Sequence, residues 1–561
     1  MPTRTGRIWR IGILLWGLAV AFGRIALVRG EDVPPLPSAR ETAAAPAPSV
    51  EQLAERLRKM EETNRRLAEQ LERNTREHDQ QMRQLLGRYA ELEKRVSEGP
   101  RREGQASEPA VEPLPTMDGG GESDLGSPIP DYYSFEPEPA VSDPHYRLSN
   151  INAPPKRPLQ VNFGPGFQLQ TDDEEFRLQI HVLEQVEGRA WANGGHAPPA
   201  NGFFFPRQRI FFNGRITKPI EYVFSLNRGL NSVDLLDAFL NINLDDRFQV
   251  RFGRFMTPLT YDQFAIRPMW LPTPERSLFT TNLGLNRQIG LMGWGYLFDK
   301  RLDYAAGIFN GSRNSFQSLN NGKDFIAYLN ARPFQDSESL WFLKYLNVGS
   351  SIDFGQQDQA PIPRSLRIGA VSPDAALPSV ASVPYLTLNP NVIERGDRLL
   401  MSVHGAYYFR SLTLLGEWQY GYNSYAIPGR QSTAVPISGY YVTAAYFLTG
   451  EHVENRTMLQ PRRPLIPTGP NQVRGLGAWE AVTRVSRLSV GQDVFTAGFA
   501  DPSLWSNSAV TTEVGMNWYW NEHFKMYIFW LHGTFGDPVL VRPGDFQKSS
   551  DMFWLRCQLW F

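Results

Sequence analysis

Cysteine is almost missing from this sequence: Cys557 is the only one among 561 residues. A single thiol excludes an intramolecular disulfide framework and any metal site built from several cysteines. A charge bias is missing as well, because 57 Lys and Arg residues stand against 58 Asp and Glu residues. Nucleic-acid-binding proteins usually carry a basic excess, so we predict no nucleic-acid partner.

Motifs of catalysis are missing too. The eight histidines are scattered, and neither H-E-x-x-H nor G-x-S-x-G occurs. We therefore predict no catalytic residues, no metal, no cofactor and no enzymatic activity. One alternative is a lipase built on the outer wall of a barrel, with His532 facing outward, but no serine partner can be assigned to it.

Long apolar runs are rare. The stretch "IGILLWGLAVAFG" (11–23) follows Arg4, Arg7 and Arg10. It is shorter than the roughly 20 residues of a transmembrane helix, and a basic start before a short apolar run is typical of a secretory signal. We predict a signal peptide over residues 1–30, with an uncleaved membrane anchor as the alternative. After it, no segment has 18 consecutive apolar residues.

Residues 50–97 have the period of a helix. Steps of four and three residues connect Leu53, Leu57, Met60, Asn64, Leu67, Leu71, Asn74 and His78. The phase then shifts at Met82, which is the stutter of an unwound supercoil. Polar Asn64 and Asn74 in the apolar seam are devices that fix register and oligomer number. The pattern predicts a coiled coil, and a single solvated helix is the alternative.

Residues 98–160 are dominated by proline, glycine and acidic residues, as in "EPAVEPLPTMDGGGESDLGSPIP". Such a composition buries too little apolar surface to offset the entropy of the chain. We predict a disordered linker.

From residue 161 to 561 the sequence alternates with a period of two. In "FRLQIHV" (176–182) and "RQRIFFNGRI" (207–216), apolar residues share one side of an extended chain and polar residues the other. This alternation predicts strands with one apolar and one wet face.

Two kinds of connection separate these strands. Short turns are predicted at 217–219, 245–247, 299–301, 409–411 and 521–523. Longer connections are predicted at 261–286, 355–395 and 453–474, and we expect them to alternate with the short turns. Short turns at one end and long loops at the other are typical of an outer-membrane barrel, whereas a soluble β-sandwich is the alternative.

The last stretch, "FWLRCQLWF" (553–561), alternates in the same way. A barrel in lipid needs its last strand to pair with its first, because an open edge leaves backbone groups unsatisfied. We predict that Phe561 and Leu559 form the signal that the barrel-assembly machinery recognises.

Several stretches resemble the phosphate-selective porins O and P. The likeness covers most of 170–561 and is most specific in "SGYYVTAAYFLTGE" (438–451), "GAWEAVTRVSRLSV" (477–490) and "VGMNWYWNEHFKMYIFWLHGTF" (514–535). It implies an all-β barrel of about 16 antiparallel strands, a homotrimer in the lipid of a bacterial outer membrane, with the coiled coil in the periplasm. It also implies a water-filled channel for small hydrophilic solutes, with phosphate among the candidate anions.

Rings of Arg and Lys favour anions in such pores. The predicted pore-lining cations are Arg177, Arg207, Arg209, Arg215, Arg251, Arg254, Arg287, Arg484 and Lys525, with Arg276 and Arg556 as further candidates. Alternatively, these arginines pair with lumen acids such as Asp237, Glu417 and Glu480. Met256 stands where relatives often have a basic residue, so the resemblance does not carry phosphate specificity.

A structural role is the alternative to a channel. A coiled coil ahead of a barrel would tether the outer membrane to the cell wall, with the pore secondary. Conductance of the barrel separates the two hypotheses.

Overall fold

The computed structural model describes residues 157–561, apart from 165, 193–198, 230–231, 319 and 371–381. The predicted signal peptide, the predicted coiled coil and nearly all of the predicted linker lie outside the described residues. The first strand begins at Leu159, within the range predicted as linker.

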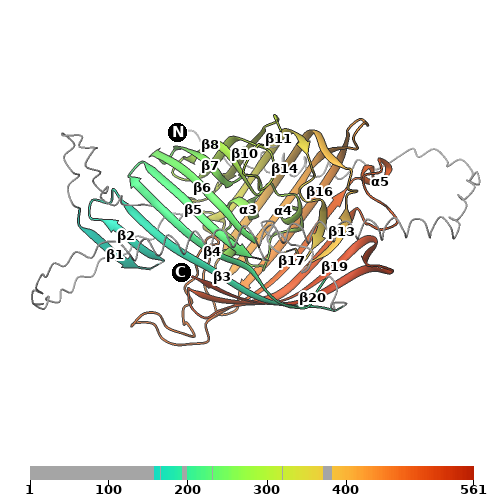
Figure 1. The fold of residues 1–561 in the computed structure, drawn as a ribbon. Coiled ribbons are helices and arrows are strands. Elements are labelled where there is room, and N and C mark those ends of the chain that lie inside the picture. Colours follow the sequence, from blue (N-terminus) through green and yellow to red (C-terminus); the bar gives the residue numbers. More distant parts are fainter. Residues whose placement is uncertain (1–156, 165, 193–198, 230–231, 319, 371–381) are drawn as a thin grey trace, which may run out of the picture. The chain divides into compact units, whose positions relative to one another are not determined.

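The described chain forms a closed antiparallel barrel of 16 strands (Figure 1). Each strand pairs with the next along the chain, and the last pairs with the first. The strands are β3 (Arg177–Trp191), β4 (Gly202–Thr217), β5 (Ile220–Gly229), β6 (Ser232–Asp245), β7 (Phe248–Met256), β8 (Arg287–Leu297), β9 (Leu302–Phe309), β10 (Asp324–Ala331), β11 (Tyr345–Gln359), β14 (Ile393–Phe409), β15 (Leu412–Ala426), β16 (Thr433–Phe447), β17 (Ala478–Val490), β18 (Ser508–Tyr519), β19 (Phe524–Arg542) and β20 (Asp545–Trp560).

The closing seam joins β20 to β3. Met552 to Trp560 pair with Trp191 to Leu183, and Phe561 then exchanges backbone hydrogen bonds of 3.1 and 3.2 Å with Val182. The closure that the final alternating stretch predicts is therefore present, and the fold class predicted from the sequence is confirmed.

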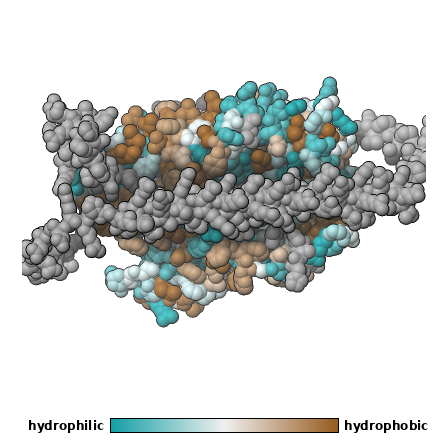
Figure 2. Space-filling view, in the orientation of Figure 1, coloured by the Kyte–Doolittle hydropathy of each residue, from teal (hydrophilic) through white to brown (hydrophobic). Residues whose placement is uncertain are grey.

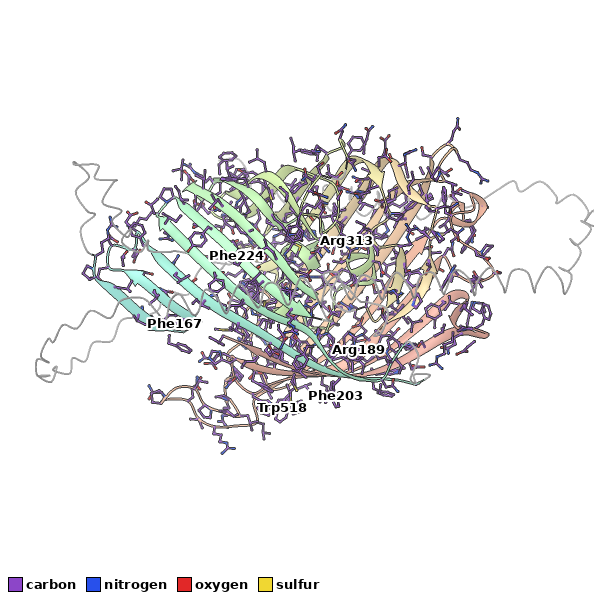
Figure 3. The ribbon with its side chains drawn as sticks, in the orientation of Figure 1. Phe167, Arg189, Phe203, Phe224, Arg313 and Trp518 are labelled. Carbon is purple, nitrogen blue, oxygen red and sulfur yellow. The ribbon has the colours of Figure 1, made fainter. Side chains whose placement is uncertain are left out.

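Alternating side chains explain why these residues form a wall. In β20, Phe553 and Leu555 are exposed on the outside, whereas Trp554 and Arg556, which alternate with them, are buried. Figure 2 shows hydrophobic residues over much of the wall in view, and Figure 3 marks Phe203 and Phe224, which are 84% and 39% exposed. Apolar residues outside and polar residues inside are the arrangement of a barrel that stands in lipid.

All five short turns predicted from the sequence lie at one end of the barrel, here called the turn end. The opposite end, the loop end, carries the connections 257–286 and 360–392. The prediction that long connections alternate with tight turns is wrong for 453–474. That segment joins β16 to β17 at the turn end. The short connection 427–432 already joins β15 to β16 at the loop end, so β16 runs back to the turn end before this segment begins.

Two short strands extend the sheet below the seam. β1 (Leu159–Phe163) pairs with β2 (Phe167–Thr171), and β2 pairs with the part of β3 that β20 does not reach. No helix among the described residues is both long and apolar enough to span a membrane.

The interior of the barrel is filled by chain. The connection 257–286 carries α3 (Tyr261–Phe264), the 3-10 turn η1 (Pro268–Trp270) and α4 (Leu278–Leu283). The connection 360–392 carries the hairpin β12 (Ser365–Ile368) and β13 (Val383–Thr387). Two smaller elements, η2 (Trp341–Leu343) and α5 (Asp493–Thr496), lie in connections between strands.

These inserted segments make a core with the inward side chains of the wall. Phe279 of α4 and Tyr385 of β13 are almost fully buried, as are Tyr441 and Tyr527 of the wall. Gly439 of β16 allows the close approach of α4, because a Cβ there would stand 3.3 Å from the Cβ of Phe279. The lumen of this barrel is thus largely occupied by its own connections.

A candidate pore held by an inserted loop

The connection 257–286 joins β7 to β8 and lies in the lumen of the barrel. It is here called the inserted loop. Its α4 begins at Ser277, whose hydroxyl accepts a hydrogen bond from the Thr280 amide. Arg313, from the connection after β9, donates to the carbonyl of Thr281 over 2.7 Å, and also to that of Asn282. Figure 3 labels Arg313.

Donors of the wall hold the backbone of the inserted loop from 269 to 276. Five of its carbonyl oxygens each accept a hydrogen bond from a polar side chain of β17 to β20. The pairs are Gln558 to Met269 (3.1 Å), Lys525 to Leu271 (2.9 Å), Asn517 to Pro272 (2.7 Å), Arg556 to Pro274 (2.5 Å) and Arg484 to Arg276 (3.0 Å). Because buried carbonyl groups need partners, these bonds satisfy the loop inside the barrel.

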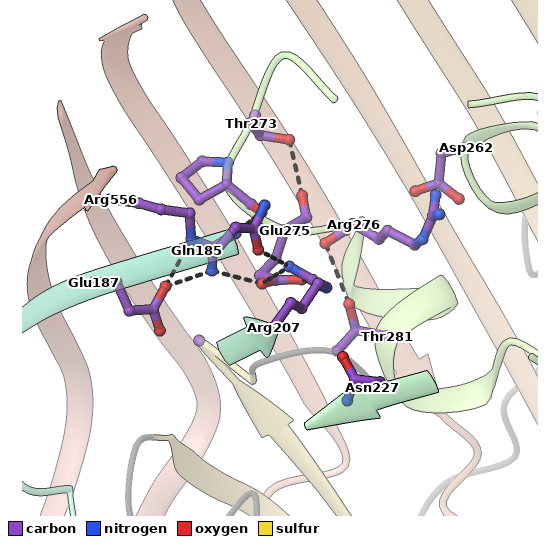
Figure 4. A network of polar contacts seen from close by, with 12 residues as sticks. Gln185, Glu187, Arg207, Asn227, Asp262, Thr273, Glu275, Arg276, Thr281 and Arg556 are labelled. Carbon is purple, nitrogen blue, oxygen red and sulfur yellow. Dashed lines mark hydrogen bonds and ion pairs between the residues drawn. The ribbon is translucent and has the colours of Figure 1, made fainter. Parts of the chain in front are cut away.

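Glu275 is the point where the loop meets the charged part of the wall (Figure 4). Its two carboxylate oxygens accept from the two terminal nitrogens of Arg207 in β4, over 2.9 and 2.5 Å. Arg556 of β20 donates to the same carboxylate over 2.7 Å. The fork-on-fork contact with Arg207 is the strong form of a guanidinium–carboxylate pair.

A second carboxylate completes this cluster. Glu187 of β3 accepts from Arg556 over 2.7 Å, from Arg189 over 2.8 Å and from the Trp554 indole over 2.8 Å. The Arg189 guanidinium also lies 4.1 Å from the centre of the Trp554 ring. We call Glu187, Arg189, Arg207, Glu275 and Arg556 the seam cluster. All five side chains are buried, and their formal charges sum to +1.

Burial alone raises the pKa of a carboxyl group, but for Glu275 the two guanidiniums outweigh burial. Arg207 and then Arg556 lower the pKa of Glu275 to about 2. The carboxylate is therefore ionised at any physiological pH, and the ion pairs with both arginines persist.

Three of the predicted pore-lining cations contact the inserted loop. Arg207 pairs with Glu275, while Arg484 and Lys525 donate to loop carbonyls. Arg484 also pairs with Glu513 of β18 over 2.6 Å. The Lys525 ammonium lies 4.0 Å from the centre of the Tyr527 ring. The structure thus brings these cations together around the loop.

Other predicted cations have partners outside the inserted loop. Arg287 pairs with Asp237 of β6 over 2.9 Å, and Arg209 donates to Asn227 of β5 over 3.0 Å. Arg254 donates over 2.6 Å to the carbonyl of Ser315, in the connection between β9 and β10. The alternative of pairing with lumen acids therefore describes Arg207, Arg287 and Arg484.

The remaining three predicted cations are only partly buried. Arg251 lies over the rings of Phe239 and Trp294, at 4.4 and 4.8 Å. Arg215 donates to the carbonyl of Glu174 at the turn end and stands opposite Arg177 in the pairing of β3 with β4. The structure does not bring Arg207, Arg209 and Arg215 into one cluster.

The sequence prediction missed the acidic half of the seam cluster. Glu187 could have been predicted to face the lumen, because Gln185, Glu187 and Arg189 follow the polar residues of "FRLQIHV" with the same period of two. Glu275 carries no such signal, because its place depends on how a long loop folds into the barrel.

The model of the family described as "Phosphate-selective porin O and P" matches residues 388–534. Over this segment the chain is similar to that porin family. The predicted recognition is thereby confirmed. The porin segment includes Arg484 and Lys525, whereas Arg207, Glu275 and Arg556 lie outside it.

Solved structures of outer-membrane proteins are similar to this chain at low sequence identity. The trimer form of OmpT of Vibrio cholerae has a TM-score of 0.40 and 10% identity, covering 68% of this chain and 99% of that one. The channel DcaP of Acinetobacter baumannii has a TM-score of 0.40 and 9% identity, covering 71% and 99%. An anion-selective porin of Comamonas acidovorans has a TM-score of 0.38 and 10% identity, covering 68% and 99%.

No curated protein matches the chain. Within the described part of the chain, no group of three or more His, Cys, Asp or Glu side chains could hold a metal ion. Family and fold together support an outer-membrane channel.

Proposed function

We propose that this porin is a channel for passive diffusion of small hydrophilic solutes across a bacterial outer membrane, without enzymatic activity. The observation that carries the proposal is the closed barrel, with an apolar outer wall and a polar inner face. A lipid-facing barrel with polar residues inside is built to let water-soluble molecules pass.

Anions, phosphate among them, are the solutes that the inner face fits best. Arg207, Arg484, Lys525 and Arg556 all contact oxygen atoms of the inserted loop. Guanidinium groups match the paired oxygens of carboxylate and phosphate, so the same donors suit a passing anion.

Passage requires the inserted loop to move. Phe279 and its neighbours fill the lumen, and the loop is held by side chains from β17 to β20. A population of barrels with the loop displaced would carry the current, as in other proteins whose loops gate access.

The assembly that goes with this function is a homotrimer in outer-membrane lipid. Residues 1–30 would export the chain, residues 50–97 would form a periplasmic coiled coil, and residues 98–160 would link it to the barrel. The barrel-assembly machinery would insert the barrel through its last strand, including Leu559 and Phe561. These proposals come from the sequence patterns described above.

Reversal potentials test the function directly. The purified full chain is placed in a planar bilayer with a gradient of potassium chloride, and the voltage of zero current is measured. We expect ionic current with a reversal potential on the anion-selective side. A protein that inserts but passes no current contradicts the channel, whereas cation selectivity contradicts only the preference for anions.

A further inference from the structure

Arg207 and Arg556 form a clamp around one carboxylate, and that carboxylate belongs to a loop. Glu187, the other acid of the seam cluster, stands on β3 and is held by Arg189, Trp554 and Arg556. Glu275 comes from the inserted loop and has no wall strand of its own. Of the two acids, Glu275 is the one that can leave while the wall stays closed.

The clamp has the geometry of an anion site. Arg207 meets both oxygens of Glu275, Arg556 adds a third hydrogen bond, and Gln185 accepts from Arg207 over 2.8 Å and so orients its guanidinium. The Nε atom of Arg207 is buried without a hydrogen-bond partner, so this arginine has one further N–H that can donate to an anion. Three donors on one pair of oxygens is how proteins bind carboxylate and phosphate.

Charge favours a replacement for Glu275. With both acids in place, the three arginines leave the seam cluster at +1, and withdrawal of Glu275 alone would leave it at +2. A buried cluster with two uncompensated charges is costly, so withdrawal is favourable only when another anion enters.

A small cavity lies next to the clamp, with room for about one water molecule, so a larger solute enters only when the inserted loop moves. The charged side chains that border the cavity are Glu275, Arg276, Arg367, Arg484 and Glu513. Three of these five are arginines, so an anion that enters as the loop moves stays close to positive charge on its way to the clamp.

We propose that Arg207 and Arg556 form an anion-binding site of the pore, which Glu275 occupies as a built-in ligand, and that a carboxylate- or phosphate-bearing solute binds there in exchange for Glu275. This inference rests on the proposed function, and it names a site in the pore at which a permeating anion binds. Occupation by solute releases one charged anchor of the inserted loop, so binding and loop displacement are coupled.

Glu275→Gln is the variant that tests the exchange. It keeps the shape of the side chain and removes the built-in anion, so inorganic phosphate no longer competes with a carboxylate. We expect phosphate to block chloride current at a concentration about tenfold lower than in the wild type, a change that one charge-assisted hydrogen bond can give. A half-blocking concentration equal to that of the wild type overturns the proposal.

Two further variants sharpen the result. Arg207→Gln in the Glu275→Gln background is expected to raise the half-blocking concentration again, and unchanged sensitivity in that double variant overturns the proposal. Asp353→Asn is the matched control. It removes a buried carboxylate from Arg398, which lies 3.0 Å away and keeps Asp324 as a partner. We expect its phosphate response to equal that of the wild type.

Calorimetric titration of the detergent-solubilised full chain with inorganic phosphate separates the site from the channel. Tighter binding by Glu275→Gln supports the site even where no variant passes current, in which case only the channel fails. If Glu275→Gln does not fold, Glu275→Asp replaces it. The shortened carboxylate is expected to bind phosphate more tightly than the wild type, and equal affinity overturns the proposal.

Discussion

The ring of Phe163 in β1 stacks on the ring of Phe561 at the end of β20, with centroids 6.0 Å apart and planes 19° apart. Both rings stand beside β3, whose edge is shared end to end by β2 and β20. His181 of β3 stacks in turn on Trp560, with centroids 5.1 Å apart. The seam of the barrel is therefore closed by backbone pairing and covered by aromatic contacts.

Deletion of residues 559–561 is expected to lower the amount of barrel in the outer membrane strongly, and Phe561→Ala to lower it less. The deletion removes the pairs of Leu559 with Glu184 and of Trp560 with Leu183, which opens the edge that lipid cannot satisfy. Immunoblots of outer-membrane fractions measure the effect. Glu112→Ala in the predicted linker is the control, and a deletion variant at the control level would refute the prediction.

Gly439→Ala is expected to destabilise the barrel by about 1–3 kcal/mol, the usual cost of overpacking. The added Cβ would lie 3.0 Å from the Arg487 carbonyl oxygen and 3.3 Å from Phe279, so the backbone of β17 and α4 must both give way. Gly416→Ala is the matched control, since the nearest atom to its Cβ would be 3.7 Å away. Urea unfolding followed by gel mobility compares the two, and equal midpoints would show that the helix does not press on β16.

The fold could be predicted from the sequence because its signal is local. The period of two in "RQRIFFNGRI" assigns inside and outside to β4 without knowledge of any other strand, and the structure buries Arg207 and Arg209 as that pattern requires. The end of the barrel at which 453–474 lies depends on how many strands precede it. The sequence prediction did not include the short connection 427–432, so it placed 453–474 at the wrong end. Whether an odd or an even number of strands precedes a connection decides at which end of the barrel it lies.

The site could be predicted only in part. The wall cations follow from the same alternation, but their partners do not, because Glu275 reaches Arg207 across 68 residues of chain. The paths of loops inside a barrel are set by tertiary contacts, such as those of Phe279 with Gly439. The predicted set of pore-lining arginines therefore identified the inner face of the barrel. It did not show that the inserted loop of the same chain lies against that face.

Neighbouring positions on β4 are expected to respond in opposite ways. Ile210→Arg places a charge on the outer wall and should cost about 2–4 kcal/mol near the middle of the membrane. Arg209→Gln changes an inward side chain that donates to Asn227, so it should leave stability nearly unchanged and shift the reversal potential toward cations.

Folding into lipid vesicles measures the first effect and bilayer recordings the second. The triple variant Arg207→Gln, Arg209→Gln and Arg215→Gln should shift selectivity further. It should also lose stability, because Glu275 then keeps only Arg556. Normal insertion of Ile210→Arg together with unfolding of Arg209→Gln would mean that the two faces of β4 are reversed.

The exported chain is expected to be a trimer in detergent, with a protein mass about three times that of a single chain. The polar seam positions Asn64 and Asn74 are expected to help fix the number of chains. Light scattering with refractive-index detection gives the protein mass without the detergent. Asn64→Leu is expected to change the distribution of oligomers, and a monomer with and without residues 50–97 would contradict the prediction.

The ion pairs of Glu275 with Arg207 and Arg556, which hold the inserted loop to the wall, are expected to persist in mild acid and to be lost only in strong acid. The pKa of Glu275 lies at about 2 instead of 4.5. A lowered pKa stabilises the folded state above pH 4.5, and this contribution, on the order of 3 kcal/mol, is lost as the pH falls from 4.5 through 2. The charged groups around Glu275 include Arg207 of β4, Arg556 of β20, Glu187 and Arg189 of β3, Glu513 of β18 and the adjacent Arg276.

Unfolding midpoints in urea between pH 7 and pH 2 measure this contribution. The wild type should lose stability relative to Glu275→Gln as the pH falls below 4.5, because the amide has no proton to take up. Between pH 7 and pH 5 the difference between the two proteins should stay constant, since Glu275 remains ionised in both the folded and the unfolded chain. A difference that already shrinks at pH 6 would mean that the arginines do not hold the carboxylate in its charged form, and the clamp would then not be the anchor of the loop.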